Sequence, residues 1–259
     1  MDTPPSLAAR VRGRFPALFL LARRGYHLVS ALAGTRVQEI RWARRGAAEV
    51  SRGFSNLDHP HRQFILEHIT RLGPWASLLE VGSGYGPNLY HLARRFPDAV
   101  LQGLDINPVS VSMGTAWLRK VGLAQVDLSV GRGDDLRKFA NGEFDLVLTN
   151  AFLMYIGPDR IERTVGEMLR VARRHLILVE HQWNEDDSHG AGRFQSGRWM
   201  RDYEALLRRC APGWRVDVTK VPAAVWSDEA WQRFGCIITC RLAIEGGEDA
   251  HAHAGHRPR

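Results

Sequence analysis

The sequence has few cysteines and no long hydrophobic run. Three of its 259 residues are cysteine, and an odd number indicates reduced thiols rather than a disulfide framework. Cys236 and Cys240 are four residues apart on one predicted strand, so they share a face but lie too far apart to bridge easily. The longest hydrophobic run, Phe15 to Ala22, has eight residues, against about 18 to 20 for a membrane-spanning helix. These features predict a globular protein of the cytoplasm.

Acidic residues are scarce at the start of the chain. The first sixty residues contain ten arginines and four acidic residues, a net charge of +6, whereas the whole chain carries +7. Leu18, Leu21, Gly25, Leu28 and Leu32 form a narrow helical stripe in this segment, which favours a helix packed as a lid over the domain. Two alternatives stay open, namely peripheral contact of residues 10–45 with an anionic membrane surface and a grip on RNA phosphates.

Glycines are concentrated at one informative point. The stretch from Leu78 to Asp105 is an apolar strand, a glycine-rich turn, a helix and a second strand that ends on an acid. Gly82, Gly84 and Gly86 allow a tight turn and a close approach of the backbone to a small molecule. Asp105 lies where a carboxylate accepts hydrogen bonds from ribose hydroxyls. The stretch therefore predicts an adenosine-type ligand.

The glycine spacing narrows the choice of ligand. A dinucleotide site reads G-x-G-x-x-G, whereas this chain reads E-x-G-x-G-x-G from Glu80 to Gly86, with Pro87 at the next position. The pattern resembles the S-adenosylmethionine loop of class I methyltransferases. That resemblance implies S-adenosyl-L-methionine as cofactor, and a methyl transferase activity. The implied cofactor-binding residues are Glu80, Gly82, Ser83, Gly84, Gly86, Asp105, Ile106, Asp134, Asp135 and Asn150.

Within that set, Asp134 and Asp135 are adjacent, and either of them could be the acid that binds the cofactor. The family commonly places an acid near this position to accept from the adenine amino group, and Asp134 is favoured over Asp135 because it directly follows Gly133. Either residue could instead cap the short helix ahead. The family also runs the segment from Asn150 to Tyr155 beside the transferable methyl group.

The remainder of the chain continues the alternation of strands and helices. Its apolar periodicity predicts an α/β fold of seven strands with helices between most of them. The resemblance to class I methyltransferases implies that the strands form a Rossmann-like, mostly parallel sheet, whose last two strands form a hairpin. We expect a basic helical extension in residues 1–54, the methyltransferase domain in 55–243 and a disordered tail in 244–259. The elements expected after Asp105 are helices over 109–121, 161–174 and 198–210 and strands over 126–131, 144–149, 175–180, 214–221 and 234–242.

The acceptor is less well defined by the sequence. His181 follows the fifth predicted strand, and an imidazole there could take a proton from an acceptor hydroxyl; Glu180 is the alternative base, and a purely structural histidine is the alternative role. Trp183 nearby offers an apolar face to a ring. Asp58, His59, His61 and Arg62 form a second polar cluster ahead of the first strand, with helix capping or contact with cofactor or acceptor as its roles.

The segments Ser55 to Ile69, Phe152 to Ile161 and Arg198 to Leu207 resemble small bacterial class I methyltransferases, a group associated with glycan or secondary-metabolite assembly. That resemblance implies methyl transfer to a small-molecule or glycan acceptor, and we expect it at oxygen. No N-P-P-Y or D-P-P-Y motif follows the fourth strand, which argues against a nucleic-acid base as acceptor, and Asp145 with Asn150 does not make a metal-ligand set. An RNA methyltransferase that uses the arginine-rich extension and a catalytically silent cofactor-binding protein are the rival functions.

Overall fold

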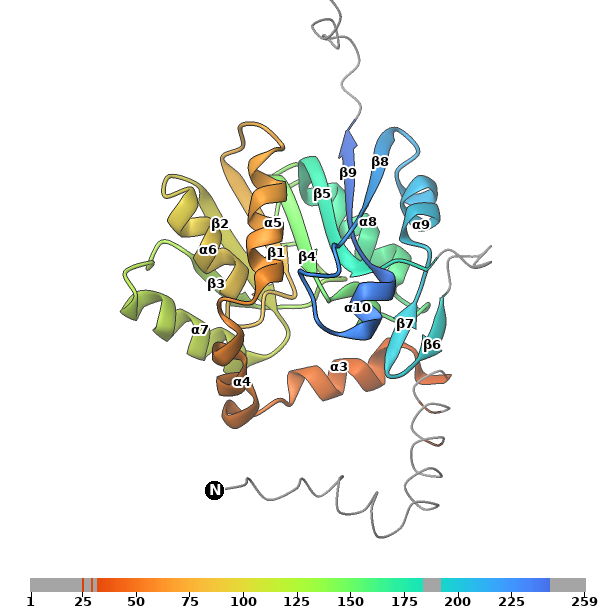
Figure 1. The fold of residues 1–259 in the computed structure, drawn as a ribbon, viewed down its shortest axis with the longest axis horizontal. Helices are drawn as coiled ribbons and strands as arrows, with labels where there is room; N and C mark the ends of the chain where they lie inside the picture. The colour runs from red at the N-terminus through yellow and green to blue at the C-terminus, as the bar shows by residue number, and fades with distance from the viewer. Residues whose placement is uncertain (1–24, 26–28, 30–31, 184–191, 243–259) are drawn as a thin grey trace, which may run out of the picture.

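The computed structural model describes residues 25, 29, 32–183 and 192–242. Within them seven strands form one sheet in the order β3-β2-β1-β4-β5-β9-β8 (Figure 1). β9 runs antiparallel to both of its neighbours, and all other pairs of this sheet are parallel. The predicted fold class, with its antiparallel strand in a terminal hairpin, is confirmed. The strands are β1 (Ser77–Val81), β2 (Val100–Asp105), β3 (Asp127–Val130), β4 (Phe144–Asn150), β5 (Ala172–His181), β8 (Trp214–Lys220) and β9 (Gly235–Leu242).

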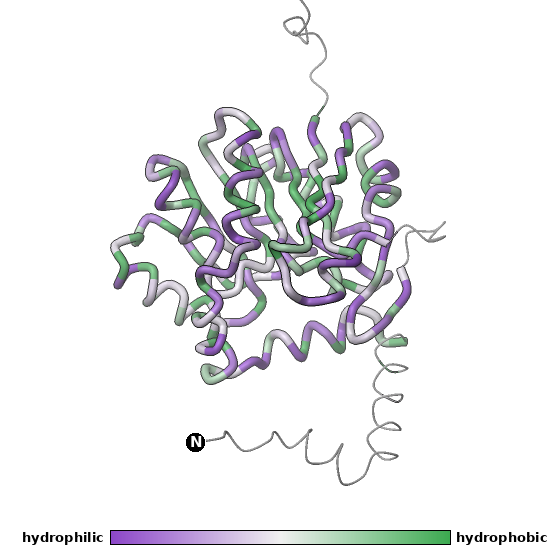
Figure 2. The backbone as a smooth tube through the Cα atoms, in the orientation of Figure 1, coloured by the Kyte–Doolittle hydropathy of each residue, from purple (hydrophilic) through white to green (hydrophobic). Residues whose placement is uncertain are grey.

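Helices cover both faces of the sheet and give a three-layer arrangement. Successive side chains of a strand point to opposite faces, so Leu78 packs beneath α5, α6 and α7 while Leu79 packs beneath α8 and α9. The central strands are accordingly the most hydrophobic segments (Figure 2). The helices are α3 (Thr35–Ala43), α4 (Ala47–Gly53), α5 (Pro60–Thr70), α6 (Pro87–Arg95), α7 (Pro108–Lys120), α8 (Ile161–Val171), α9 (Tyr203–Cys210) and α10 (Glu229–Phe234), with 3-10 turns η1 (Phe54–Asn56) and η2 (Leu153–Tyr155).

Two predicted helix boundaries were wrong. The helix expected over 161–174 ends at Val171, because β5 already begins at Ala172 and pairs with the start of β4. The helix expected from Arg198 begins only at Tyr203. Arg198–Met200 is instead a strand, β7, that pairs with β6 (Arg193–Gln195). Ser196 and Gly197 both have positive φ in the turn between them, as a two-residue hairpin turn requires.

The carboxyl ends of the parallel strands face the N-terminal segment. Helix α3 runs across this edge, with α4 beside it and the β6–β7 hairpin at its other end (Figure 1). The leucine stripe predicted from Leu18 to Leu32 lies mostly outside the described residues, as do residues 1–24 and the tail predicted over 244–259. No helix among the described residues is long and apolar enough to cross a membrane.

The three cysteines carry free thiols. Cys236 and Cys240 are both buried in β9, and burial raises the pKa of the Cys240 thiol to about 12. They act as small apolar side chains of the core.

Candidate functional site

The glycine-rich turn leaves β1 in a conformation that only glycine adopts easily. Gly82, Gly84 and Gly86 have φ of 78°, 57° and 82°, in the left-handed region where a Cβ is strained. A Cβ on Gly82 would also lie 2.6 Å from the ring of Phe152. Pro87 takes the first position of α6, where its missing N–H costs nothing. The predicted turn is present.

Asp105 holds this turn against the end of β2. Its Oδ2 accepts a hydrogen bond from the backbone N–H of Gly84 and its Oδ1 accepts from Asn107, each at 2.8 Å. Burial raises the pKa of the carboxyl group, and the two backbone donors oppose that shift. Each carboxylate oxygen has a second lone pair, so Asp105 can still accept from a bound hydroxyl.

A cavity of about 330 Å³ opens between the strand ends and α3. Its volume is in the usual range for small-ligand sites. Eight of the ten predicted cofactor-binding residues line it, and Gly86 and Asp135 do not. The eight are Glu80, Gly82, Ser83, Gly84, Asp105, Ile106, Asp134 and Asn150.

One end of the cavity holds a buried acid, an amide and a guanidinium. Glu80 is 2% exposed, and its Oε1 accepts from Asn88 at 2.6 Å. The oxygen of Asn88 accepts in turn from Arg62 at 2.7 Å. Burial raises the pKa of Glu80 to about 8, and Asn88 and Arg62 offset only part of that. Sequence reasoning missed Asn88, although its position one residue after Pro87 on α6 faces it toward β1.

The buried polar atoms of the cavity wall that have no hydrogen-bond partner among the described residues include the ring nitrogen of Trp42 and three oxygens. The oxygens are Glu80 Oε2, Ser83 Oγ and Asn150 Oδ1. An unsatisfied buried polar atom costs about 1 to 3 kcal/mol, and three in one cavity are the pattern expected where a polar ligand completes the bonding. The wall therefore suits a ligand that presents hydrogen-bond donors to Glu80, Ser83 and Asn150.

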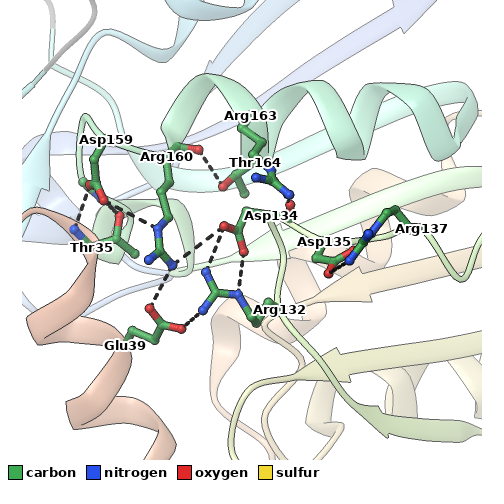
Figure 3. A network of polar contacts seen from close by, with 11 residues as sticks. Thr35, Glu39, Arg132, Asp134, Asp135, Arg137, Asp159, Arg160, Arg163 and Thr164 are labelled. Atoms are coloured by element: carbon green, nitrogen blue, oxygen red, sulfur yellow. Dashed lines mark hydrogen bonds and ion pairs between the residues drawn. The ribbon is translucent and has the colours of Figure 1, made fainter.

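The opposite end of the cavity is a ring of alternating charges, shown in Figure 3. Arg132 donates to both oxygens of Asp134, at 2.9 Å each, and to Glu39. Arg160 donates to Glu39 at 2.8 Å and lies 3.7 Å from Asp134. Glu39 comes from α3, so this ring joins the N-terminal segment to the domain. Neither arginine was singled out in the sequence, because each lies among several others.

The acidic doublet is divided by this arrangement. Asp134 belongs to the ring and lines the cavity. Asp135 does not line the cavity and pairs with Arg137 at 2.7 Å (Figure 3). That surface pair lowers the pKa of Asp135 to about 2. Asp134, the favoured residue of the two, is thus the one that lines the cavity, and its contact with an adenine amino group stays a prediction.

Helix α3 covers the cavity with one face. Thr35, Gln38, Glu39 and Trp42 all line it and recur at the spacing of one helical face. The start of the helix is fixed because Thr35 donates from its backbone N–H and its hydroxyl to Asp159, at 2.8 Å each. This periodicity was available in the sequence, but its polar residues do not read as a buried face.

The third side of the cavity is the segment after β4. Phe152, Tyr155 and Ile156 line it, and the Tyr155 ring packs 4.8 Å from that of Trp42. Glu180 holds this segment from beneath: its Oε1 accepts from Phe152 and Leu153 at 2.9 and 2.8 Å, and its Oε2 accepts from Met154 at 3.2 Å. Arg201 donates to the carbonyl of Ile156 at 3.0 Å at the other end of η2.

Neither predicted base reaches the cavity wall. Glu180 and His181 are both 0% exposed and absent from the lining. The His181 ring lies 4.3 Å from that of Trp231, and burial lowers its pKa to about 4. Trp183 packs 5.0 Å from Phe234.

The second polar cluster meets the cavity through two residues. Arg62 lines it directly, and His61 Nε2 lies 3.3 Å from the amide nitrogen of Asn150. Since that amide can only donate, Nε2 accepts and the His61 proton sits on Nδ1, 2.6 Å from His59 Nδ1. Burial and Arg62 lower the pKa of His61 to about 2, so His61 is neutral. No group of His, Cys, Asp or Glu side chains in the described part of the chain is arranged to hold a metal ion.

Comparison with known proteins finds matches to the central part of the chain. Residues 78–175 match the family model described as a methyltransferase domain. A trans-aconitate 2-methyltransferase from Deinococcus radiodurans is 34% identical over 99 residues, which are 38% of this chain and 35% of that protein. The chain thus spans about a third of the length of this curated relative.

Solved structures agree on the fold. A geranyl diphosphate C-methyltransferase from Streptomyces coelicolor A3(2), solved with Mg²⁺, geranyl diphosphate and S-adenosyl-L-homocysteine, has a TM-score of 0.57 at 14% identity. The match covers 76% of this chain and 83% of that one. The cyclase SpnF has a TM-score of 0.55 at 21% identity, over 71% of this chain and 81% of its own.

Proposed function

We propose that this chain, whose residues 78–175 belong to the methyltransferase domain family, transfers a methyl group from S-adenosyl-L-methionine to a small-molecule acceptor, at oxygen. The observation that carries the proposal is the coincidence of the family match with the cavity. The glycine turn, Asp105 and three unpartnered polar atoms all face one space of ligand size. Such a space fits the chemistry of the cofactor group by group.

The residues present match the polar groups of that cofactor. Asp134 can accept from an adenine amino group, and Asp105 can accept from ribose hydroxyls. Glu80 can accept from an α-ammonium group, and the guanidinium of Arg62 can bind an α-carboxylate. When bound, S-adenosyl-L-methionine supplies a methyl group already activated on a sulfonium. The protein then has to orient an acceptor and exclude water, which is worth roughly 7 to 11 kcal/mol.

The chain's own residues have distinct tasks in this proposal. Trp42 and Tyr155 close the cavity on the side of the Asn150 segment and exclude water there. Glu180 fixes η2, and through it Phe152 and Tyr155. His181, the last residue of β5, packs against Trp231 as a structural residue. A base for a hydroxyl acceptor therefore has to be another group, one that lies beside the bound acceptor. Helices α3 and α4 act as a cover over the cofactor.

The acceptor class is open to direct assay. The relatives act, by name, on trans-aconitate and geranyl diphosphate, which are small molecules, and we propose a small molecule here over a glycan. Trans-aconitate and geranyl diphosphate are the first compounds to test. A protein that binds the cofactor but methylates no acceptor is the alternative, and the likeness to the cyclase SpnF shows that the fold is shared beyond methyltransferases.

Replacement of Asp105 by alanine tests the proposal. The change removes the expected ribose acceptor, and it also removes the acceptor for the backbone N–H groups of Gly84 in the turn and of Asn107 after β2. Because hydrogen bonds to a charged group are worth about 1.5 to 3 kcal/mol each, we expect S-adenosyl-L-methionine affinity to fall at least tenfold in calorimetry. Asp98→Ala, in the exposed turn before β2, is the matched control. Equal affinity in the wild type and the Asp105 variant would remove the cofactor assignment.

A further inference from the structure

Helix α3 reverses the usual arrangement of polar and aliphatic residues on a surface helix. The face that covers the cavity is mostly polar, since Thr35 and Gln38 are 4% and 1% exposed and Glu39 lines the cavity beside them. A surface helix normally buries its aliphatic residues and exposes its polar ones. In α3 the aliphatic Ile40 is instead 43% exposed, and Val37 is partly exposed. Packing within the described part of the chain therefore does not account for these two residues.

The outward side of α3 follows from helical spacing. Because an α-helix has about 3.6 residues per turn, the residues between the cavity-lining positions fall on the opposite side of the helix. That side, which we call the outer face, consists of Arg36, Val37, Ile40, Arg41 and the C-cap residue Arg44. All three arginines are exposed. Helix α3 forms the lower edge of the described molecule in Figure 1, so the outer face points away from the sheet.

The outer face carries three positive charges and no acid. The acids of this stretch are engaged elsewhere, since Glu39 pairs with Arg132 and Arg160 at the cavity and Glu49 lies 3.9 Å from Arg45. Within the residues that the structure describes, none of the three outer-face arginines forms an ion pair. A surface of one charge sign attracts partners of the opposite sign.

Exposed aliphatic side chains also occur just before α3. Leu32 is 80% exposed and Val29 is 55% exposed. With Ile40 they make three of the eight large hydrophobic side chains that are exposed in the described part of the chain, and the other five are scattered between Val100 and Leu242. Single exposed aliphatic residues need no explanation, whereas several in one short stretch mark an interaction surface.

We propose that the outer face of α3, together with Leu32 just before the helix, docks on an anionic phospholipid surface. The arginines bind lipid phosphates, and the aliphatic side chains enter the boundary between headgroups and acyl chains. The helix then lies along the surface. Membrane contact is one of the roles that the sequence left open for residues 10–45. The contact is independent of the proposed function, because the outer face points away from the cavity.

RNA offers the same phosphate charge as an anionic lipid but no apolar layer. Sequence-independent binding of nucleic acid relies on cations and on aromatic side chains that stack on bases. The outer face has aliphatic residues beside its arginines and no aromatic residue. Its composition therefore favours a lipid surface over RNA.

The test measures co-sedimentation of the full chain with phosphatidylcholine vesicles, prepared with and without phosphatidylglycerol. We expect saturable binding to the anionic vesicles alone, and weaker binding as NaCl is raised. Because each arginine near an anionic surface strengthens binding about fivefold, the triple variant Arg36→Gln/Arg41→Gln/Arg44→Gln should bind on the order of a hundredfold more weakly. The arginines of residues 1–24 are present in both proteins and cancel from the comparison.

The triple variant Arg71→Gln/Arg94→Gln/Arg119→Gln is the matched control. It removes the same charge from exposed arginines at the carboxyl ends of α5, α6 and α7. Each of these helix ends precedes the start of a strand, so the control sites lie at the edge of the sheet opposite α3. The control should bind anionic vesicles as the wild type does. Urea denaturation of each variant verifies that it is folded.

Ile40→Gln tests the apolar contact without a change of charge. We expect about threefold to tenfold weaker binding to anionic vesicles, because a partly exposed aliphatic side chain is lost from the contact. Val121→Gln is the control, since Val121 is also 43% exposed but lies at the end of α7. It should bind as the wild type does.

Three results would overturn the proposal. They are wild-type affinity in the arginine variant of α3, no binding of the wild type to anionic vesicles, and equal binding to vesicles without phosphatidylglycerol. Wild-type affinity in Ile40→Gln, together with tighter binding of the wild type to single-stranded RNA than to vesicles, would make the outer face a nucleic-acid site and would also contradict the lipid contact.

Discussion

Glu80 carries the largest conflict between burial and charge at the candidate site. Its carboxyl group is almost wholly buried, yet Oε2 has no partner among the described residues and Oε1 has one. An ionised carboxylate in such surroundings is unfavourable, which is why the pKa rises to about 8. A ligand ammonium placed against Oε2 would relieve the conflict. The same reasoning applies with less force to Ser83 and Asn150, whose unpartnered oxygens are neutral.

This conflict predicts a pH dependence of stability. The folded-state pKa of about 8 lies above the ordinary value of 4.5, so the folded protein binds the proton more tightly than the unfolded chain does. The stabilisation is complete below pH 4.5 and is lost as pH rises through 8. Relative to Glu80→Gln, the ligand-free wild type should lose free energy of unfolding across this window in urea titrations.

Glu67→Gln, an exposed change on α5, is the control for that comparison. Its free energy of unfolding should change with pH in the same way as that of the wild type. A constant difference between the wild type and Glu80→Gln from pH 5 to 8 would show that Glu80 does not hold its proton. Glu180, whose pKa is raised to about 7 by burial, is present in all three proteins and cancels from the difference.

Gly82 and Gly84 lie in the same turn, so the effects of alanine at the two positions on stability can be compared directly. Alanine at either position occupies the left-handed region, at about 1 to 2 kcal/mol. The Gly84 position has open space around an added Cβ, whereas at Gly82 the Cβ would press on Phe152, for a further 1 to 3 kcal/mol or so. Gly82→Ala should therefore be the less stable variant in urea denaturation. Equal stability would mean that Phe152 moves aside without cost.

At the scale of elements, η2 depends on two buried charges. The Glu180 carboxylate accepts from the N–H groups at the start of the turn, and Arg201 donates to carbonyl groups at Leu153 and Ile156. This arrangement matches the direction of the backbone dipoles in a helical turn. Because Phe152, Tyr155 and Ile156 line the cavity, the buried pair determines the shape of its acceptor side.

Glu180→Ala should destabilise the protein by about 3 to 5 kcal/mol, because it leaves several buried donors without an acceptor. Thr149→Val is the comparison: it removes only the 3.2 Å bond from the Thr149 hydroxyl to Glu180, and we expect a loss of about 1 kcal/mol. Chemical denaturation gives both values. Similar losses in the two variants would contradict a dominant role of the Glu180 carboxylate.

The elements that the sequence predicted correctly are those whose formation depends on residues close together in the chain. Hydrophobic periodicity located every strand of the main sheet, and the glycine turn with Pro87 located the start of α6. The β6–β7 hairpin was missed because its strands have three residues each, too few to show a period. The contributions of Arg132 and Arg160 were missed because each depends on Glu39, which is far away in the sequence. The assignment of His181 as a base rested on strand order alone, which does not reveal that Trp231 lies against its ring.

At the scale of the whole molecule, the cavity is shared between the domain and the N-terminal segment. Eight of its lining residues come from the stretch between Thr35 and Gly53. Several polar contacts hold this stretch to the domain: Glu39 to Arg132 and Arg160, Thr35 to Asp159, and the Asn107 amide to the carbonyls of Trp42 and Arg45 at 2.8 and 2.9 Å. We propose that these contacts must open for the cofactor to leave.

Glu39→Gln tests that role of the cover. The change removes the charge through which α3 pairs with both arginines, while Asp134 still pairs with Arg132. A loss of about 1.4 kcal/mol in the closed state corresponds to a tenfold faster release of S-adenosyl-L-homocysteine, measured by stopped-flow fluorescence.

Since Glu39 is 17% exposed, salt should screen the wild-type pairs in part. Wild-type release should therefore accelerate as NaCl is raised, and release from Glu39→Gln should depend less on salt. Glu67→Gln, which removes a surface charge far from α3, should keep the wild-type rate and salt dependence. Unchanged release from Glu39→Gln would mean that the cofactor leaves by a route that α3 does not block.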